Sequence, residues 1–209
     1  MPTKNWARIT IALFAAIMLG ISLITGDSLD ENGIRWISGV SGAVILLLLI
    51  YDRSVWRWPL IRKLAENTGR PVIRGTWKGV LEYTKDAKGN PGSIDFYLSV
   101  DQTYSLLTIR GFVSTSESYS LTASIDRPLP NQRRLVFAYH SHAPHPSRNK
   151  NRPHDGTAIL NIIGISAKSL SGSYYTDRGG SGTIQLTDYS PKLSESYEDA
   201  AAQTYRKAN

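Results

Sequence analysis

The stretch SGSYYTDRGGSGTIQL, from Ser171 to Leu186, indicates how the larger part of this chain folds. If the segment up to Arg178 is extended, its side chains alternate between two faces. One face then carries Tyr174, Thr176 and Arg178, and the other carries Ser173, Tyr175 and Asp177. The glycines that follow supply the positive φ angles of a tight hairpin turn. They lack the lysine of a Walker phosphate loop and lead into a strand, so the stretch predicts an antiparallel hairpin.

Similar short segments, rich in β-branched and aromatic residues, recur from Val72 onward and are separated by turn sequences such as KDAKGNPG and DRPLPN. The segments that we expect to be strands are 73–83, 92–102, 104–116, 118–126, 133–142, 156–164, 170–178 and 182–188. Short connections favour a meander order. The pattern therefore predicts a mainly antiparallel β domain, either a sandwich or a small barrel of about eight strands.

The N-terminal part has a different composition, because residues 9–26 and 36–51 contain no charged side chain. The length of each run is close to the roughly 17–25 residues that a membrane-spanning helix needs. Aromatic residues flank the two runs as interfacial anchors: Trp6, Trp36, Tyr51 and Trp56. A cleaved signal peptide and a buried helical hairpin are the alternatives. The absence of a clear cleavage site argues against the first, and the aliphatic run VILLLLIY argues against the second. We expect two N-terminal transmembrane helices.

Charges around these two runs predict their orientation. Lys4 and Arg8 precede the first run, three acidic residues lie in the short connection, and four basic residues follow the second run: Arg53, Arg57, Arg62 and Lys63. Because positive residues stay on the cytoplasmic side, both termini and the β domain are expected in the cytoplasm. The domain organisation predicted is a transmembrane hairpin at 1–58, a basic juxtamembrane linker at 59–71, a β domain at 72–190 and a tail at 191–209. The tail is expected either to form a short helix or to be disordered.

The overall composition limits the chemistry available to the chain. It has 209 residues, a formal net charge of +7 and no cysteine. The missing cysteines exclude disulfides, thiolate zinc sites and a cysteine nucleophile. The positive charge favours an anionic partner such as phospholipid or nucleotide.

Four histidines are the residues most suggestive of catalysis: His140, His142, His145 and His154. His140 and His142 share a face of an extended strand, where two imidazoles can hold a metal ion. No convincing third ligand accompanies them, and the GxSxG and HExxH motifs are absent. We therefore expect no catalytic residue and no metal. A membrane-anchored hydrolase built on His140, His142 and His154, or a non-enzymatic adaptor, remains the alternative.

Other strand faces favour a binding cavity inside the β domain. In LVFAYHS, alternation places Leu135, Phe137, Tyr139 and Ser141 on one face, and residues 114–120 are rich in hydroxyl groups. This interior is more polar than a packed core requires, which favours a barrel that holds a small molecule.

The layout as a whole resembles a known family. Two short spans, a basic linker, RGTWKGVLEY, VSTSESYSLTASI, LVFAYHSHAP and LSGSYYTDRGGSGTIQL are together similar to the SMODS-associating two-transmembrane, β-strand-rich effectors of bacterial CBASS anti-phage systems. The resemblance covers residues 5–188. Its most specific parts are the GTWKG opening of the barrel and its YxTDR ending.

The resemblance implies a function and a location. Members of this family bind a cyclic oligonucleotide, here expected to be a cyclic dinucleotide, in the β-barrel, and a partner CD-NTase makes that ligand. Binding causes self-association of the effector in the bacterial inner membrane, membrane disruption and abortive infection. No cofactor and no DNA or RNA polymer is implied.

Strand alternation and the resemblance together suggest ligand contacts. Tyr139 and Tyr174 would stack on bases, Thr176 would bond ribose or base edges, and Arg178 would pair with a phosphate. Weaker candidates are Trp77, Arg110 and Ser118. These assignments depend on strand parity, which a single bulge reverses.

Overall fold

The computed structural model describes residues 11, 14–17, 31–58, 61, 71–84, 90–129, 132–143, 152–164 and 167–208. The chain divides into two compact units, one of Met1–Trp58 with Thr103–Ser105 and the other of Pro59–Gln102 with Leu106–Asn209. Most of the predicted first span, most of the linker, and residues 144–151, which include His145, lie outside the described residues.

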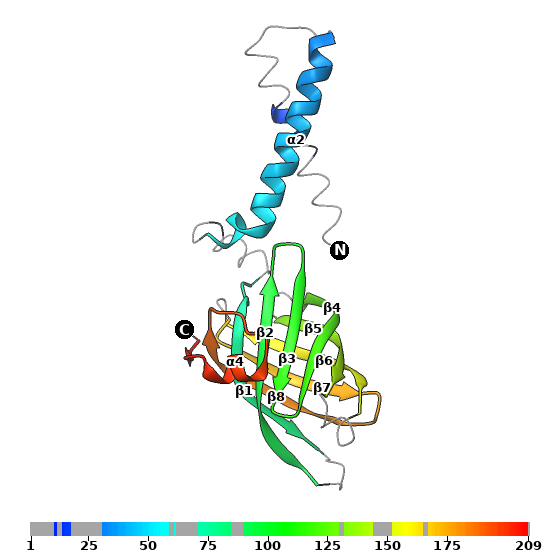
Figure 1. The fold of residues 1–209 in the computed structure, drawn as a ribbon, viewed down its shortest axis with the longest axis vertical. Coiled ribbons are helices and arrows are strands. Elements are labelled where there is room, and N and C mark those ends of the chain that lie inside the picture. Colours follow the sequence, from blue (N-terminus) through cyan, green and yellow to red (C-terminus); the bar gives the residue numbers. More distant parts are fainter. Residues whose placement is uncertain are drawn as a thin grey trace. The chain divides into compact units, whose positions relative to one another are not determined.

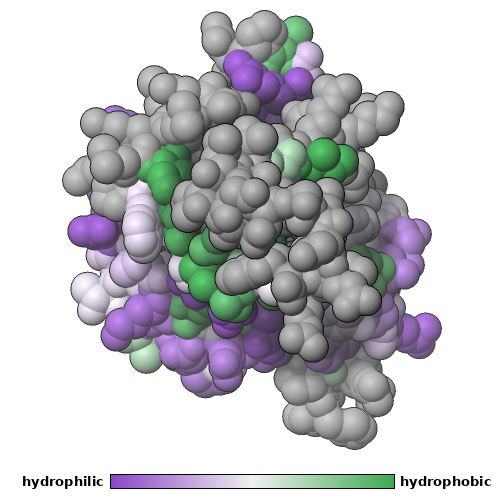
Figure 2. Space-filling model, turned by 90° about the horizontal axis from the view of Figure 1, so that it is seen from above, coloured by the Kyte–Doolittle hydropathy of each residue, from purple (hydrophilic) through white to green (hydrophobic). Residues whose placement is uncertain are grey.

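The first unit contains helix α2, Glu31–Arg53, and a single 3₁₀ turn, η1, Val55–Arg57. The predicted second span, 36–51, falls entirely within α2. Large aliphatic side chains of this helix are exposed: Ile45, Leu46, Leu47, Leu49 and Ile50. Exposed hydrophobic and strongly hydrophilic residues lie next to one another in the space-filling view (Figure 2). Within the described residues, no helix combines the length and the apolar character needed to cross a membrane.

The second unit is an eight-stranded antiparallel β-barrel, as the sequence predicts (Figure 1). Its strands are β1 Gly75–Tyr83, β2 Gly92–Gln102, β3 Leu107–Val113, β4 Ser116–Leu129, β5 Gln132–His142, β6 His154–Ile163, β7 Ser169–Thr176 and β8 Ser181–Ser190. Each strand pairs with the next along the chain, and β8 pairs with β1 to close the barrel. The meander order predicted from the short connections is confirmed.

Several strand ends differ from the pattern-based prediction. β3 ends at Val113 because Ser114 and Thr115 form a tight turn, so the predicted strand 104–116 is too long. β7 ends at Thr176, two residues before Arg178. β4 continues to Leu129, into the stretch DRPLPN that was predicted as a turn. The register of β1 against β8 shifts once, between Lys78 and Gly79.

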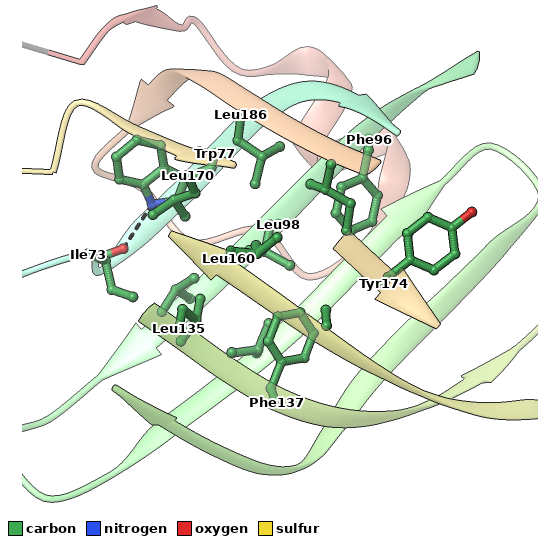
Figure 3. Close-up of a cluster of buried hydrophobic side chains, with 14 of the residues drawn as sticks. Ile73, Trp77, Phe96, Leu98, Leu135, Phe137, Leu160, Leu170, Tyr174 and Leu186 are labelled. Atoms are coloured by element: carbon green, nitrogen blue, oxygen red, sulfur yellow. Dashed lines mark hydrogen bonds between the residues drawn. The ribbon is translucent and has the colours of Figure 1, made fainter. Parts of the chain in front are cut away.

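Aliphatic and aromatic side chains pack the interior at one end of the barrel (Figure 3). Trp77 lies there and its indole N–H donates a hydrogen bond to the Ile73 carbonyl over 2.9 Å. Fully buried leucines surround it: Leu98, Leu135, Leu160, Leu170 and Leu186. We call this the packed end. Tyr174 lies at the other side of the cluster, away from Trp77 (Figure 3).

The C-terminal tail is ordered and lies on the outside of the barrel. Helix α4, Tyr197–Ala202, is the short helix that was one of the two expectations for the tail, and its Ser196 cap accepts a bond from the Asp199 N–H. α4 covers Tyr97 and Phe112, which point outward from β2 and β3 and are buried by Ala200. A two-residue strand, β9 Arg206–Lys207, then pairs with β8.

Candidate functional site

A cavity of about 340 Å³ occupies the barrel end opposite the packed end. Its walls come from the end of β1, β3, β5 and β7 and from the beginning of β2, β4, β6 and β8. In a meander these eight positions meet at one rim. The volume is within the roughly 300–1,000 Å³ range typical of small-molecule pockets. We call this the mouth of the barrel.

Aromatic side chains form much of the cavity wall. Four of the lining residues are Tyr83, Phe96, Tyr139 and Tyr174, and a fifth, Phe137, lies deeper on the same strand as Tyr139. Tyr139 and Phe137 have ring centroids 6.0 Å apart. Such rings offer flat apolar faces on which a planar base stacks.

Hydroxyl groups add hydrogen-bonding capacity around these rings. Thr115, Ser116, Ser118, Ser141 and Ser181 line the cavity. The Ser118 hydroxyl lies 3.4 Å from the Gly111 carbonyl, and the Ser141 hydroxyl lies 3.4 Å from the Glu117 carbonyl. Bonds of this length are weak, so both hydroxyls are available to a ligand.

The hydroxyls of Tyr139 and Tyr174 remain protonated because burial raises the pKa of both groups. Burial raises the pKa of Tyr139 well above its usual range, with smaller contributions from Tyr174 and Asp177. Burial also raises the pKa of Tyr174, assisted by Tyr83. These groups are therefore neutral hydrogen-bond donors and not phenolates.

The cavity wall has little charge. Among its described lining residues there is no lysine or arginine. Glu117 contributes to the lining, but its carboxylate oxygen lies 3.9 Å from Nη2 of Arg110 on the outer face. The imidazole of His154 also lines the mouth, and its Nδ1 lies 3.2 Å from the Arg152 carbonyl. An anionic group entering deeply would find no described lysine or arginine to neutralise it, whereas bases would be accommodated.

Of the three candidate ligand contacts on the hairpin that begins at Ser171, two line the cavity and one lies in the turn. Tyr174 and Thr176 line the cavity, as alternation predicts. The Thr176 hydroxyl accepts a bond from the Gly180 N–H over 3.0 Å, which holds the turn. Arg178 lies in that turn, where Nη2 donates to the Pro153 carbonyl over 3.2 Å. Its guanidinium is therefore at the rim and not on the strand face, because the strand has already ended. Gly179 has φ +75°, as expected for this turn.

The structure does not bring Trp77 or Arg110 to the cavity. Trp77 is 1% exposed and belongs to the packed end. Arg110 points outward because β3 directs Ile109 and Gly111 to the interior, and its guanidinium lies over the Phe112 ring at 5.4 Å. Ser118, the other weaker candidate, does line the cavity.

The histidines do not converge on one point. His140 and His142 share the outer face of β5, as predicted, and both contact the Tyr119 ring. His140 Nδ1 lies 2.7 Å from the Asp155 carboxylate. His154 faces the cavity instead. In the part of the chain that the structure describes, no three His, Cys, Asp or Glu side chains are grouped closely enough to hold a metal ion.

Sequence reasoning missed two prominent members of the wall, Tyr83 and Phe96, and it considered His154 only as part of a hydrolase site. Tyr83 follows Trp77 by an even number of residues on β1, so alternation alone would have placed it inside. The cavity itself depends on which strands are neighbours, and no local pattern contains that information.

Two comparisons with known proteins agree with this geometry. A family model described as "Cap15, cyclic dinucleotide receptor domain" matches residues 68–188, which contain all eight barrel strands except the last residues of β8. The CD-NTase-associated protein 15 of Escherichia albertii is 20% identical over 192 residues, which cover 90% of this chain and 96% of that protein.

Proposed function

The chain belongs to the family of Cap15 cyclic dinucleotide receptor domains, and we propose that its barrel binds a cyclic dinucleotide made by a partner CD-NTase in a CBASS system. The observation that carries this proposal is the coincidence of the matched region with a barrel whose mouth is aromatic, rich in hydroxyls and uncharged along its described wall. The chain acts as a receptor and effector, with no catalytic step.

The charge distribution supports one orientation of the ligand. The bases enter the mouth and stack on Tyr139 and Tyr174, where the neutral tyrosine hydroxyls and Ser118 donate or accept hydrogen bonds. The phosphates stay at the rim, where Arg178 and His154 supply positive or hydrogen-bonding groups. Thr176 has its hydroxyl engaged by Gly180 and shapes the turn that presents Arg178. Trp77 and Arg110 have no contact with the ligand in this arrangement.

We further propose that residues 1–58 anchor the protein in the bacterial inner membrane with both termini in the cytoplasm. The uncharged runs at 9–26 and 36–51, the flanking basic residues and the exposed aliphatic side chains of α2 support this. Ligand binding then drives homo-oligomerisation of these segments, loss of membrane integrity and abortive infection. Deletion of residues 1–58 is expected to abolish toxicity in cells that express the ligand synthase. Persisting toxicity would exclude membrane disruption as the output.

Calorimetric titration of the detergent-purified chain with a panel of cyclic di- and trinucleotides tests the receptor proposal. Arg178→Ala is expected to weaken binding about 10-fold to 100-fold, because a charge-assisted hydrogen bond to phosphate contributes about 1.5–3 kcal/mol. Arg127→Ala is the matched control, since it removes the same charge from the far part of β4. Absence of binding to every member of the panel would refute the receptor proposal and favour the adaptor. Metal-dependent turnover that His140→Ala abolishes would favour the hydrolase.

A further inference from the structure

An arc of alternating aromatic and small residues crosses six of the eight strands on the interior, at the base of the mouth. Direct cross-strand partners connect its members in the order Gly92, Tyr83, Gly182, Tyr174, Ala158 and Phe137. Its aromatic members are two strands apart, or about 10 Å. The neighbouring positions nearer the packed end carry Leu81, Ile184 and Leu160, so the alternation is confined to the mouth.

Tyr83 lies directly across the backbone of Gly92. A Cβ built on Gly92 would lie 2.6 Å from the Tyr83 Cζ and 3.0 Å from its Cε2, and it would collide with the hydroxyl. All three nearest atoms belong to that side chain and none to the backbone. The glycine therefore provides the space in which the ring lies flat against the wall.

The same arrangement occurs twice more. A Cβ on Gly182 would lie 2.8 Å from the Tyr174 Cε1, although the Glu82 carbonyl also blocks that position. Gly156 pairs directly with Tyr139, and a Cβ there would collide with the ring and hydroxyl of Tyr139, although the Tyr175 carbonyl also blocks that position. Each of the three tyrosines of the wall thus has a glycine beneath it.

The width of an eight-stranded barrel makes these glycines significant. Such a barrel is only just wide enough for its own side chains to fill it. Rings that projected toward the axis would occupy the space that forms the cavity. Rings that lie across glycines leave the axis free and present their faces to it, an arrangement known from glycines covered by cross-strand aromatic side chains.

We propose that Gly92, Gly156 and Gly182 are positioning residues that hold the three tyrosines against the wall and so set the width of the nucleotide cavity. This inference rests on the receptor function proposed above. It predicts that the glycines determine which bases enter. A narrower cavity excludes the two-ring purines before the single-ring pyrimidines.

Gly92→Ala is the sharpest test, because the three atoms nearest to its methyl group all belong to the Tyr83 side chain. The full-length variant is titrated with cyclic di-AMP, cyclic di-GMP and cyclic di-UMP. One added methyl group in a close-fitting pocket changes affinity about 10-fold to 200-fold, and we expect a loss in this range for the purine ligands. We expect a smaller loss for cyclic di-UMP. Ser93→Ala, the next residue on β2 with its side chain on the outer face, is the matched control.

A second substitution separates positioning from general damage to the barrel. Gly92→Ala combined with Tyr83→Leu removes the displaced ring, so purine binding is expected to recover relative to Gly92→Ala alone. If Gly92→Ala does not fold, Tyr83→Leu by itself provides the test, because it widens the cavity and should favour purines further. Unchanged affinities and unchanged selectivity in a folded variant would overturn the inference while leaving the receptor proposal intact. Failure of the unaltered protein to bind any of the three ligands or the wider panel would instead refute the receptor proposal itself.

Discussion

The two ends of the barrel are built from the same eight strands but have opposite properties. At the packed end, Trp77 and five leucines are almost completely buried. At the mouth, tyrosines lie across glycines, hydroxyl groups line the wall and a cavity of about 340 Å³ remains. The difference indicates that one end supplies stability, which leaves the other free to be incompletely filled.

Single strands carry this gradient along their inward faces. On β5 the inward residues are, in order, Leu135, Phe137, Tyr139 and Ser141, and on β7 they are Leu170, Gly172, Tyr174 and Thr176. The antiparallel strand β8 runs the other way, with Gly182 toward the mouth and Ile184 and Leu186 toward the packed end. Because the gradient reverses with strand direction, hydroxyl groups collect at one rim and leucines at the other.

The largest effect that distinguishes the two ends is expected from Trp77→Ala. Truncation of a fully buried tryptophan costs about 3–5 kcal/mol of unfolding free energy, and it also removes the hydrogen bond to the Ile73 carbonyl. Urea unfolding measures this loss. Tyr175→Ala is the control, since that ring is 54% exposed on the outer face. If Trp77→Ala instead lost ligand affinity at unchanged stability, Trp77 would be a ligand contact and the division between the ends would be wrong.

A smaller loss is expected from Gln102→Met, also at the packed end. Gln102 is 1% exposed, and its side-chain oxygen accepts a bond from the Ile73 N–H over 2.8 Å while its amide donates to the Pro71 carbonyl over 3.0 Å. Methionine retains the volume but leaves two backbone groups without a partner, which costs about 1–3 kcal/mol. Ligand affinity measured in the same buffer should not change. Impaired ligand binding with normal stability would show that the packed end is coupled to the mouth.

Thr176→Val affects the mouth and is expected to cost less. The Thr176 hydroxyl accepts a hydrogen bond from the Gly180 N–H and donates a longer one, over 3.3 Å, to the Gly180 carbonyl. Its removal loses both bonds, and the shorter one is worth about 0.5–1.5 kcal/mol. The turn that carries Arg178 loosens as a result, and ligand affinity should fall more than stability does. Thr183→Val on the adjoining strand, whose hydroxyl bonds Glu82 on the outer face, is the control. Equal effects of the two variants on affinity would contradict the role of the turn.

Local patterns in the sequence predict where the strands lie, but they do not predict the difference between the packed end and the mouth of the barrel. The hairpin from Ser171 to Leu186, the meander order and the inward face of β5 follow from alternation and turn residues, which are local properties. The position of Arg178 was not predicted correctly, because the turn held by the hydrogen bond between Gly180 and Thr176 begins two residues before Arg178. The pairing of Tyr83 with Gly92 and Gly182, which opens the cavity, joins three strands, so no stretch of sequence reveals it.

The smallest and most specific effect concerns the buried tyrosine hydroxyls of the mouth. Because burial raises the pKa of Tyr139, the folded protein keeps this proton at a pH where the unfolded chain has lost it. The stability that the neutral group contributes is fully present below about pH 10, the ordinary value for tyrosine, and is lost as the pH rises above it. Tyr139→Phe removes the ionisable group while retaining the ring, so its melting temperature should match that of the unaltered protein near pH 7 and decline less steeply above pH 10. Melting curves across this range measure the difference. An equally steep alkaline decline in both proteins would mean that the hydroxyl at the mouth is already in contact with solvent, and the mouth would then resemble an open surface more than a site that shields its ligand from water.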